Sequence, residues 1–307
     1  MAQLERVGFI GVGLMGHGMA KNIAEKGFPL TVMGHRNRAP VEDLVARGAR
    51  EAKTAREIAE SSDIVVLCVT GSAQVEALAF GPDGLIAGAH DGLVVVDCST
   101  SEPASTKRLA AALGESGILF ADAPMGGTPA NTAAGTATCM VGADEAVFRR
   151  IEPVLLAFAS KASHLGPVGV GHTMKLINNF LSMGYAALYA EALALAQKSG
   201  IEPARFDRVI RGSRMDCGFY QTFMTYVLER DPNAHQFTLT NGLKDTTYVE
   251  KLAQSVGLAN PIGNAVKNSF ALAVGTGRGD LHVPMLSDVV AELNGTSLVG
   301  KRDRSSA

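Results

Sequence analysis

The sequence predicts an α/β protein in which a doubly wound parallel sheet is followed by an all-α domain, with a long helix joining the two. Short apolar, β-branched runs alternate with helical patterns through the first half of the chain. From Gly169 onward these runs disappear, and apolar residues recur three and four positions apart. The length of 307 residues suits two domains of ordinary size.

The candidate strands are short apolar runs without polar alternation, which are typical of strands buried on both faces of a sheet. They lie at residues 7–10, 30–33, 64–67, 93–96, 119–121 and 138–141. A helix is expected to begin near Asp144, and residues 164–167 then close the first domain.

The second half begins with a helix predicted from about Val170 to Lys198, with Gly200 as its stop. We therefore expect a nucleotide-binding domain over residues 1–166, an all-helical domain for substrate binding and oligomerisation over 167–300, and a solvated tail over 301–307.

Composition excludes several classes of partner. The 28 Lys and Arg residues balance 30 Asp and Glu residues, so no strong field favours nucleic acid or an anionic membrane. The longest apolar segment, 183–196, is interrupted by Glu191 and is shorter than the roughly 20 residues of a membrane span. The N-terminus lacks a signal-peptide pattern and the four cysteines are widely spaced, so we expect a cytoplasmic protein with reduced thiols.

A glycine-rich loop, Gly11-Val12-Gly13-Leu14-Met15-Gly16, follows the first strand and opens a helix. This is the context of a Rossmann dinucleotide site. The first glycine permits the tight turn, the second lets backbone approach a pyrophosphate, and the third allows close packing of the helix on the strand. The helix N-terminus then offers free N–H groups to the phosphate oxygens, so we expect Gly11, Gly13, Leu14, Met15 and Gly16 to bind the cofactor.

The residues after the second strand favour NADP over NAD. An NAD enzyme places Asp or Glu there against the 2′-hydroxyl of the ribose. This chain has His35, Arg36 and Arg38 instead, which would suit a 2′-phosphate. An exposed basic turn with no ligand is the alternative, and spacing does not decide which of the three residues touches phosphate.

Further motifs carry a resemblance to a known family over nearly the whole chain. They are Gly8–Gly16 with residues 19–22, Asp97-Cys98-Ser99-Thr100, Asp122-Ala123-Pro124, residues 135–136 and 140–142, Gly171–Asn179, and Phe237–Asp245. With these motifs the sequence resembles the β-hydroxyacid dehydrogenases, which include 3-hydroxyisobutyrate dehydrogenase, tartronate semialdehyde reductase and sulfolactaldehyde reductase.

The resemblance implies that Lys175 is the catalytic acid/base and that Asn179 holds the substrate. Residues four apart share one helix face, so both side chains can reach one oxygen. A lysine normally titrates near 10.4, and burial beside an oxidised nicotinamide would lower that pKa. The neutral amine would take the hydroxyl proton during oxidation, and the ammonium would donate it during reduction.

The resemblance also implies further contacts. Val69, Thr70, Thr100 and Lys244 match cofactor positions of the family. In the substrate loop the family serine is replaced by Gly126, and the backbone of Gly126 and Gly127 with the Thr128 hydroxyl would form an anion pocket. A purely structural glycine turn is the alternative. The Gly-x-Thr form is similar to the sulfolactaldehyde reductase branch, so a carboxylate, a sulfonate or a less polar group would fit. Phe219 and Tyr220 either line the pocket or, as we favour, pack in the core.

We therefore predict an NADP-preferring oxidoreductase that transfers hydride between nicotinamide and a small β-hydroxy acid or its semialdehyde, and that forms a homodimer or homotetramer. Imine reductases resemble this architecture but generally lack the lysine that matches Lys175. An inactive NADP-binding module would need neither Lys175 nor Asn179. No metal site is predicted, because the seven histidines form no ligand cluster.

Overall fold

The computed structural model describes residues 4–299, so the tail expected at 301–307 lies outside the described residues. The chain divides into two compact units, one ending at Lys175 and the other beginning at Leu176. This division falls inside the long helix, whereas the sequence placed a domain boundary just before that helix. We call the two parts the sheet unit and the helical unit.

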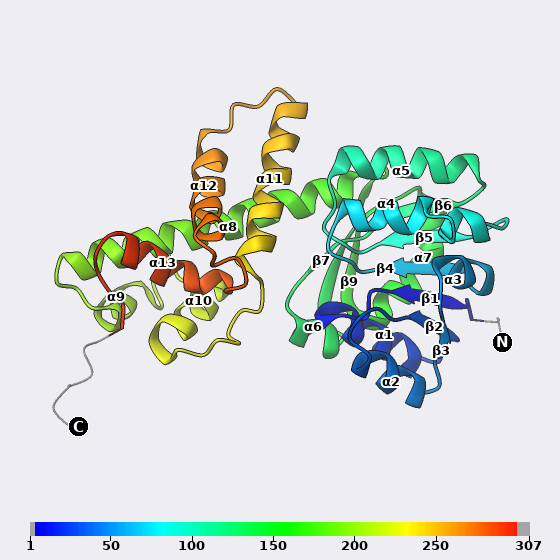
Figure 1. The fold of residues 1–307 in the computed structure, drawn as a ribbon, viewed down its shortest axis with the longest axis horizontal. Helices are drawn as coiled ribbons and strands as arrows, with labels where there is room; N and C mark the ends of the chain where they lie inside the picture. Colours follow the sequence, from blue (N-terminus) through cyan, green and yellow to red (C-terminus); the bar gives the residue numbers. More distant parts are fainter. Residues whose placement is uncertain (1–3, 300–307) are drawn as a thin grey trace. The chain divides into compact units, whose positions relative to one another are not determined.

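The sheet unit contains a nine-stranded sheet in the order β3-β2-β1-β4-β5-β6-β8-β7, with β9 paired to β8 (Figure 1). The strands are β1 (Val7–Ile10), β2 (Leu30–Met33), β3 (Arg50–Ala52), β4 (Ile64–Leu67), β5 (Val94–Asp97), β6 (Leu119–Asp122), β7 (Met125–Gly126), β8 (Ala137–Gly142) and β9 (Ala159–Gly166). Neighbours from β3 to β6 are parallel. Strand order reverses between β1 and β4, which is where this class of sheet binds ligands.

Each predicted strand is present, and the sheet is larger than predicted. The additional strands are β3, β7 and β9, and β8 runs antiparallel to β6 and β7. The first of them, Arg-Glu-Ala, is a largely exposed edge strand with no apolar run to reveal it. The second has only two residues.

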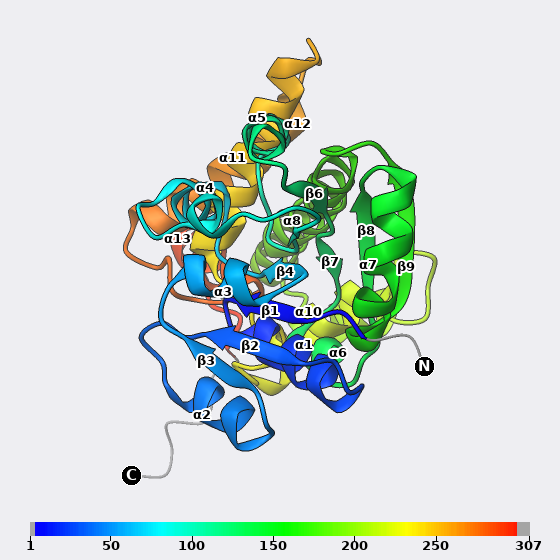
Figure 2. The ribbon, with the colours of Figure 1, turned by 90° about the vertical axis from the view of Figure 1, so that its right-hand side faces the viewer.

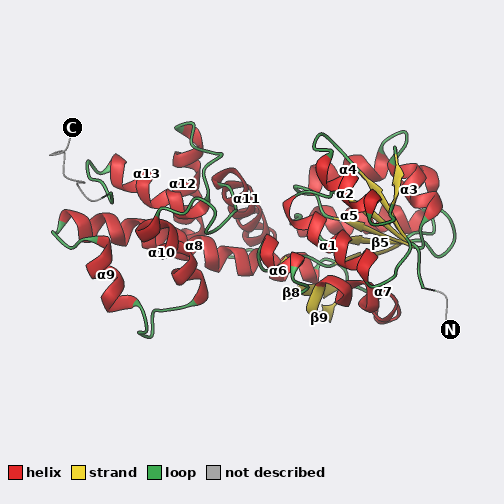
Figure 3. Cartoon of the chain, turned by 90° about the horizontal axis from the view of Figure 1, so that it is seen from below, coloured by secondary structure: helices red, strands yellow, loops and turns green. Residues whose placement is uncertain are grey.

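Helices cover both faces of the sheet (Figures 2 and 3). They are α1 (Leu14–Glu25), α2 (Ala39–Ala46), α3 (Ala55–Ser61), α4 (Ser72–Phe80), η1 (Leu85–Gly88), α5 (Pro103–Glu115), α6 (Pro129–Ala133) and α7 (Glu145–Phe158). Alternate strand residues enter different cores: Val66 packs with α1, α2 and α7, whereas Val65 packs with α3, α4 and α5. This burial on both faces explains the uninterrupted apolar strands.

The long helix α8 spans Val170–Lys198, as the sequence predicts. The helical unit continues with α9 (Pro203–Ile210), α10 (Gly218–Glu229), α11 (Leu239–Ser255), α12 (Pro261–Gly275), η2 (Val283–Met285) and α13 (Leu286–Leu293). Its core is built on Ala190, Phe223 and Phe270, which α8, α10 and α12 contribute. Between residues 170 and 299 the structure contains no strand (Figure 3).

The structure also bears on two expectations from composition, namely the lack of a membrane-spanning helix and the state of the cysteines. Among residues 4–299, no helix is both long and apolar enough to cross a membrane. The four cysteines are free, and burial raises the pKa of the Cys98 and Cys139 thiols, to about 12 for Cys139. Cys217 is exposed instead and caps the start of α10.

Candidate active site

The glycine loop after β1 has the geometry that a dinucleotide requires. Gly11 has a φ of 103°, and a side chain there would overlap the carbonyl group of Cys68. A side chain at Gly16 would overlap the Gly11 carbonyl and lie 3.0 Å from the ring of Phe9. By contrast, a Cβ at Gly13 would meet nothing within 4 Å. Packing therefore dictates the first and third glycines, and the second leaves open space for a ligand.

The first turn of α1 leaves its N–H groups available to such a ligand. Gly13 is the N-cap residue, it makes no side-chain hydrogen bond, and no acidic residue follows in the first turn. Orphan N–H groups at a helix N-terminus bind phosphate oxygens. Leu14 is exposed and Met15 half-buried at this turn. The loop thus fits the pyrophosphate of a dinucleotide.

In the basic turn after β2, Arg38 is paired with a carboxylate, whereas Arg36 and His35 are exposed to solvent. The guanidinium of Arg38 donates hydrogen bonds of 2.7 and 2.9 Å to the two carboxylate oxygens of Glu51 on β3, and this partner raises the pKa of Arg38. Arg36 and His35 are exposed and make no hydrogen bond or ion pair with another residue of the described chain. The sequence did not reveal Glu51 as a partner, because it lies on the strand that lacks an apolar run.

The predicted cofactor contacts Val69, Thr70 and Thr100 lie on adjacent loops, after β4 and β5. These loops are joined by Ser99, whose hydroxyl accepts the Val69 N–H at 3.0 Å. The Ser99 N–H in turn donates to the carboxylate of the buried Asp97 at 2.8 Å. Both loops stand at the carboxyl edge of the sheet, beside the glycine loop.

Lys175 and Asn179 lie one turn apart on α8, and Lys175 is half-buried. Asn179 is 6% exposed, and its amide donates a 2.6 Å hydrogen bond to Asp245. The Asp245 carboxylate is itself fully buried, with the Lys244 ammonium 3.1 Å from its other oxygen. The contact between Asn179 and Asp245 was not predicted, because the sequence carries no signal for it.

The substrate loop turns on Gly127, which has a φ of 120°. Thr128 begins α6 as its N-cap residue, and its hydroxyl donates to Asn131 at 2.8 Å. Gly126 pairs with Thr138 of β8, and a Cβ at Gly126 would lie 2.8 Å from the Thr138 hydroxyl oxygen. At Gly126, where the family has a serine, the nearest side-chain hydroxyl is therefore that of Thr138, which is exposed.

The two aromatic residues at the start of α10 pack within the helical unit. Tyr220 is fully buried and donates to Asp207 at 3.1 Å, while Phe219 packs on Tyr189 with ring centroids 6.4 Å apart, which matches the core role favoured above. Within residues 4–299, no cluster of His, Cys, Asp or Glu could hold a metal ion.

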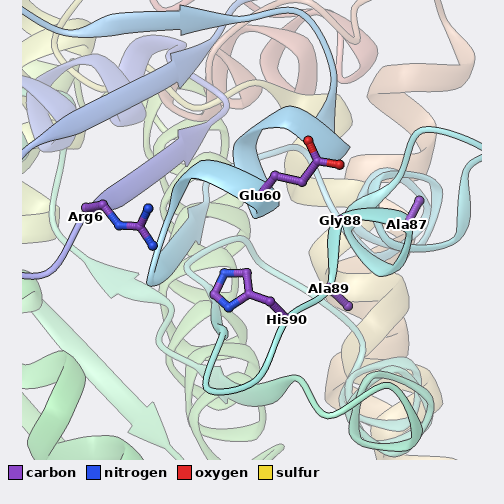
Figure 4. Close-up of a pocket in the computed structure, with 6 residues that line it drawn as sticks. All are labelled: Arg6, Glu60, Ala87, Gly88, Ala89 and His90. Carbon is purple, nitrogen blue, oxygen red and sulfur yellow. The ribbon is translucent and has the colours of Figure 1, made fainter.

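A hollow lies at the opposite, amino-terminal edge of the sheet, lined by Arg6, Glu60 and residues 87–90 (Figure 4). Two of its polar side chains are already engaged, since Arg6 pairs with Asp63 and the Nε2 atom of His90 lies 2.9 Å from the Ser62 carbonyl oxygen. The hollow is also remote from the glycine loop, because Arg6 precedes β1 and the loop follows it.

Known proteins match the chain over both units. The family model for the NAD-binding domain of 6-phosphogluconate dehydrogenase matches residues 6–166, and that for the NAD-binding region of NADP-dependent 3-hydroxyisobutyrate dehydrogenase matches residues 169–287. The chain is 32% identical to 2-hydroxy-3-oxopropionate reductase of Escherichia coli, over 90% of this chain and 94% of that protein. It is 37% identical to 2-(hydroxymethyl)glutarate dehydrogenase of Eubacterium barkeri, over 67% of this chain and 68% of that protein.

A solved structure agrees with these matches. The 3-hydroxyisobutyrate dehydrogenase of Salmonella typhimurium superposes with a TM-score of 0.84 at 29% identity, covering 92% of this chain and 99% of that one. A Rossmann sheet followed by such a helical unit defines an NAD(P)-dependent oxidoreductase. Within that class, the chain belongs to the β-hydroxyacid dehydrogenase family.

Proposed function

We propose that this protein transfers hydride between NADP and a small β-hydroxy acid or its semialdehyde. The observation that carries the proposal is the pairing of Lys175 with Asn179 on α8, where a buried carboxylate fixes the Asn179 amide. The alternatives, an imine reductase and an inactive binding module, do not require this pair. The relatives named as acting on hydroxy acids or their oxo forms support the same reading.

The mechanism assigns proton transfer to Lys175. When bound, the nicotinamide supplies the hydride acceptor or donor. The neutral Lys175 amine takes the substrate hydroxyl proton during oxidation, and the ammonium returns it during reduction. One N–H of the Asn179 amide donates to Asp245, which leaves its second N–H to hold the substrate oxygen.

The activity is tested by screening NADP-linked oxidation over C3 to C6 hydroxy acids, hydroxysulfonates and aromatic hydroxy acids. With the best substrate, we expect Lys175→Ala to bind NADP as the wild type does and to lose about 10² to 10⁴-fold in turnover, because it lacks the proton-transfer group. Unchanged turnover in Lys175→Ala, or no oxidation of any acid by the wild type, would contradict the proposal.

Preference for NADP is proposed to rest mainly on Arg36, with His35 beside it. Arg38 serves as the matched control, because its guanidinium is already paired with Glu51. We expect Arg36→Ala to raise the Kd for NADP by about 10 to 100-fold, from the loss of a charged hydrogen bond, and to leave the Kd for NAD nearly unchanged. An equal loss for both dinucleotides would show that the turn is not a phosphate site.

The acid group of the substrate is proposed to bind the backbone N–H groups of Gly126 and Gly127. Since the Thr128 hydroxyl donates to the side-chain oxygen of Asn131, it is available to an anion only if that hydrogen bond breaks. Carboxylates and sulfonates both accept from backbone N–H groups, so the hydroxysulfonates in the screen decide between them.

A homo-oligomer is proposed from the outer face of α8. Leu181, Leu188 and Leu195 are 54%, 64% and 70% exposed and recur every seven residues, which is the spacing of helices that pair along one seam. A second copy of the chain would bury this stripe. We expect sedimentation to give a dimer or tetramer and Leu188→Glu to lower the molar mass; a monomeric wild type would contradict this proposal.

A further inference from the structure

The start of α8 is fixed to the sheet by the carboxylate of Asp122, at the end of β6. One carboxylate oxygen accepts the Gly169 N–H at 2.6 Å, and the other accepts the His172 N–H at 2.7 Å. Asp122 is fully buried, and a Cβ at Gly171 would lie 2.9 Å from its carboxylate. This carboxylate thus fixes the backbone of the helix one turn before Lys175.

Burial raises the pKa of Asp122, and the nearby His172 side chain and the two backbone N–H groups oppose that rise. The backbone contacts therefore offset part of the cost of burying the carboxyl group.

The side chain of His172 connects the same turn to the rest of the sheet unit. Its ring is fully buried, with Nδ1 2.8 Å from the Thr106 hydroxyl on α5 and Nε2 3.2 Å from the Ser99 carbonyl oxygen. A carbonyl oxygen can only accept, so Nε2 carries a proton in this arrangement. The carboxylates of Asp97 and Asp122 face the ring from two sides, each with an oxygen 3.7 Å from a ring nitrogen.

These contacts join the loop of predicted cofactor residues to the helix of the predicted acid/base. Ser99 directly precedes Thr100, and its hydroxyl accepts the N–H of Val69. On the other side of the ring, Lys175 follows His172 by three residues, so it lies on the same face of α8, about a turn away.

We infer that His172 is a positioning residue that sets the distance between the loop after β5 and Lys175. It is held from one side by Asp122 through the helix backbone and from the other by Thr106 through the ring. The inference rests on the proposed function, because the distance matters only if Lys175 transfers the proton. A misplacement of about 1 Å in such a group lowers turnover by about 100-fold.

Thr106 offers the cleanest test, because it touches the ring and lies outside the catalytic and binding residues. Thr106→Val removes the hydroxyl at nearly constant volume, and Thr106→Ser keeps it. His172→Ala removes the ring, and His90→Ala, at the other edge of the sheet, is the matched histidine control. For each variant we would measure kcat, KM, the Kd for NADP, the folded fraction and the effect of D₂O on kcat.

We expect kcat to fall about 10-fold in Thr106→Val and about 100-fold in His172→Ala, with KM and the Kd for NADP within about twofold. The D₂O effect should grow in both variants, because proton transfer becomes slower relative to the other steps. Thr106→Ser and His90→Ala should resemble the wild type. If His172→Ala fails to fold, Thr106→Val decides the question alone.

A fall in kcat that only follows the folded fraction, with an unchanged D₂O effect, would overturn the inference, as would wild-type kcat in Thr106→Val. Failure of the proposed function gives a different pattern, since the wild type would then be inactive or Lys175→Ala would match it. If activity is lost in Lys175→Ala but unaffected in Thr106→Val and His172→Ala, the positioning role of His172 is contradicted and the proposed function stands.

Discussion

Gly11 and Gly16 in the sheet unit have no room for a side chain, whereas Asn179 in the helical unit is held by the side chain of Asp245. The glycine loop of the first unit therefore depends on backbone packing, whereas Asn179 of the second unit depends on a buried polar side chain. A backbone site is sensitive to added volume, and a side-chain site is sensitive to the loss of a partner. The variants below separate these two kinds of sensitivity.

Among the variants that test this comparison, the largest loss of activity is expected at Asp245, which is fully buried against Asn179 and Lys244. Asp245→Ala should lower kcat/KM by about 100-fold, because it releases the Asn179 amide from its fixed orientation. Steady-state kinetics with the best acid measures this loss. Asp207→Asn, at a buried carboxylate that instead accepts from Tyr220, should lower stability and leave kcat/KM unchanged. Equal losses of kcat/KM in the two variants would show that Asp245 has only a structural role.

The glycine loop is expected to be sensitive to added volume rather than to the loss of a polar partner. Gly16→Ala should cost about 3 kcal/mol of unfolding free energy, because its Cβ would overlap the Gly11 carbonyl. Gly13→Ala meets open space, so it should cost under about 1 kcal/mol and mainly weaken NADP binding. Urea unfolding and a binding titration check both effects. Equal stability losses in the two variants would contradict the packing account of this loop.

A serine at Gly126 would restore the hydroxyl of the family pattern. We expect Gly126→Ser to lower KM for a carboxylate substrate by about fivefold, which corresponds to one hydrogen bond of about 1 kcal/mol. Thr138 must move slightly to admit the new Cβ, and Gly126→Ala imposes the same movement without adding a hydroxyl. The same change of KM in both variants would mean that the hydroxyl plays no part.

The smallest effect is expected far from the site, at the ion pair of Arg6 with Asp63. Arg6 lowers the pKa of Asp63, so the pair stabilises the fold above the ordinary carboxyl pKa of about 3.9 and loses this contribution as the pH falls through the folded-state value. Asp63→Asn should cost under about 1 kcal/mol at pH 7, and the difference should vanish in acid. A difference that persists in strong acid would point to packing instead.

The sequence revealed those parts of the molecule that depend on apolar runs and glycine geometry. Every predicted strand and both ends of α8 are present, because strands buried on both faces need continuous apolar residues and Gly200 ends the helix. The edge strand β3 was missed, since its side chains need not be apolar.

Contacts between distant polar side chains could not be predicted. Lys175 and Asn179 were found through a motif, but the partners Asp245 and Glu51 lie 66 and 13 residues from the side chains that they hold. Nothing in the local sequence pairs such residues, because folding alone brings them together. The same holds for His172 and Thr106, which are 66 residues apart.

The most direct test of the account is a crystal structure of the enzyme with NADP and the best hydroxy acid from the screen. We expect the Lys175 Nζ atom to lie about 3 Å from the reacting oxygen, with the carbinol carbon against C4 of the nicotinamide. A Lys175 Nζ atom more than about 10 Å from C4 of the nicotinamide would contradict the proposed acid/base role.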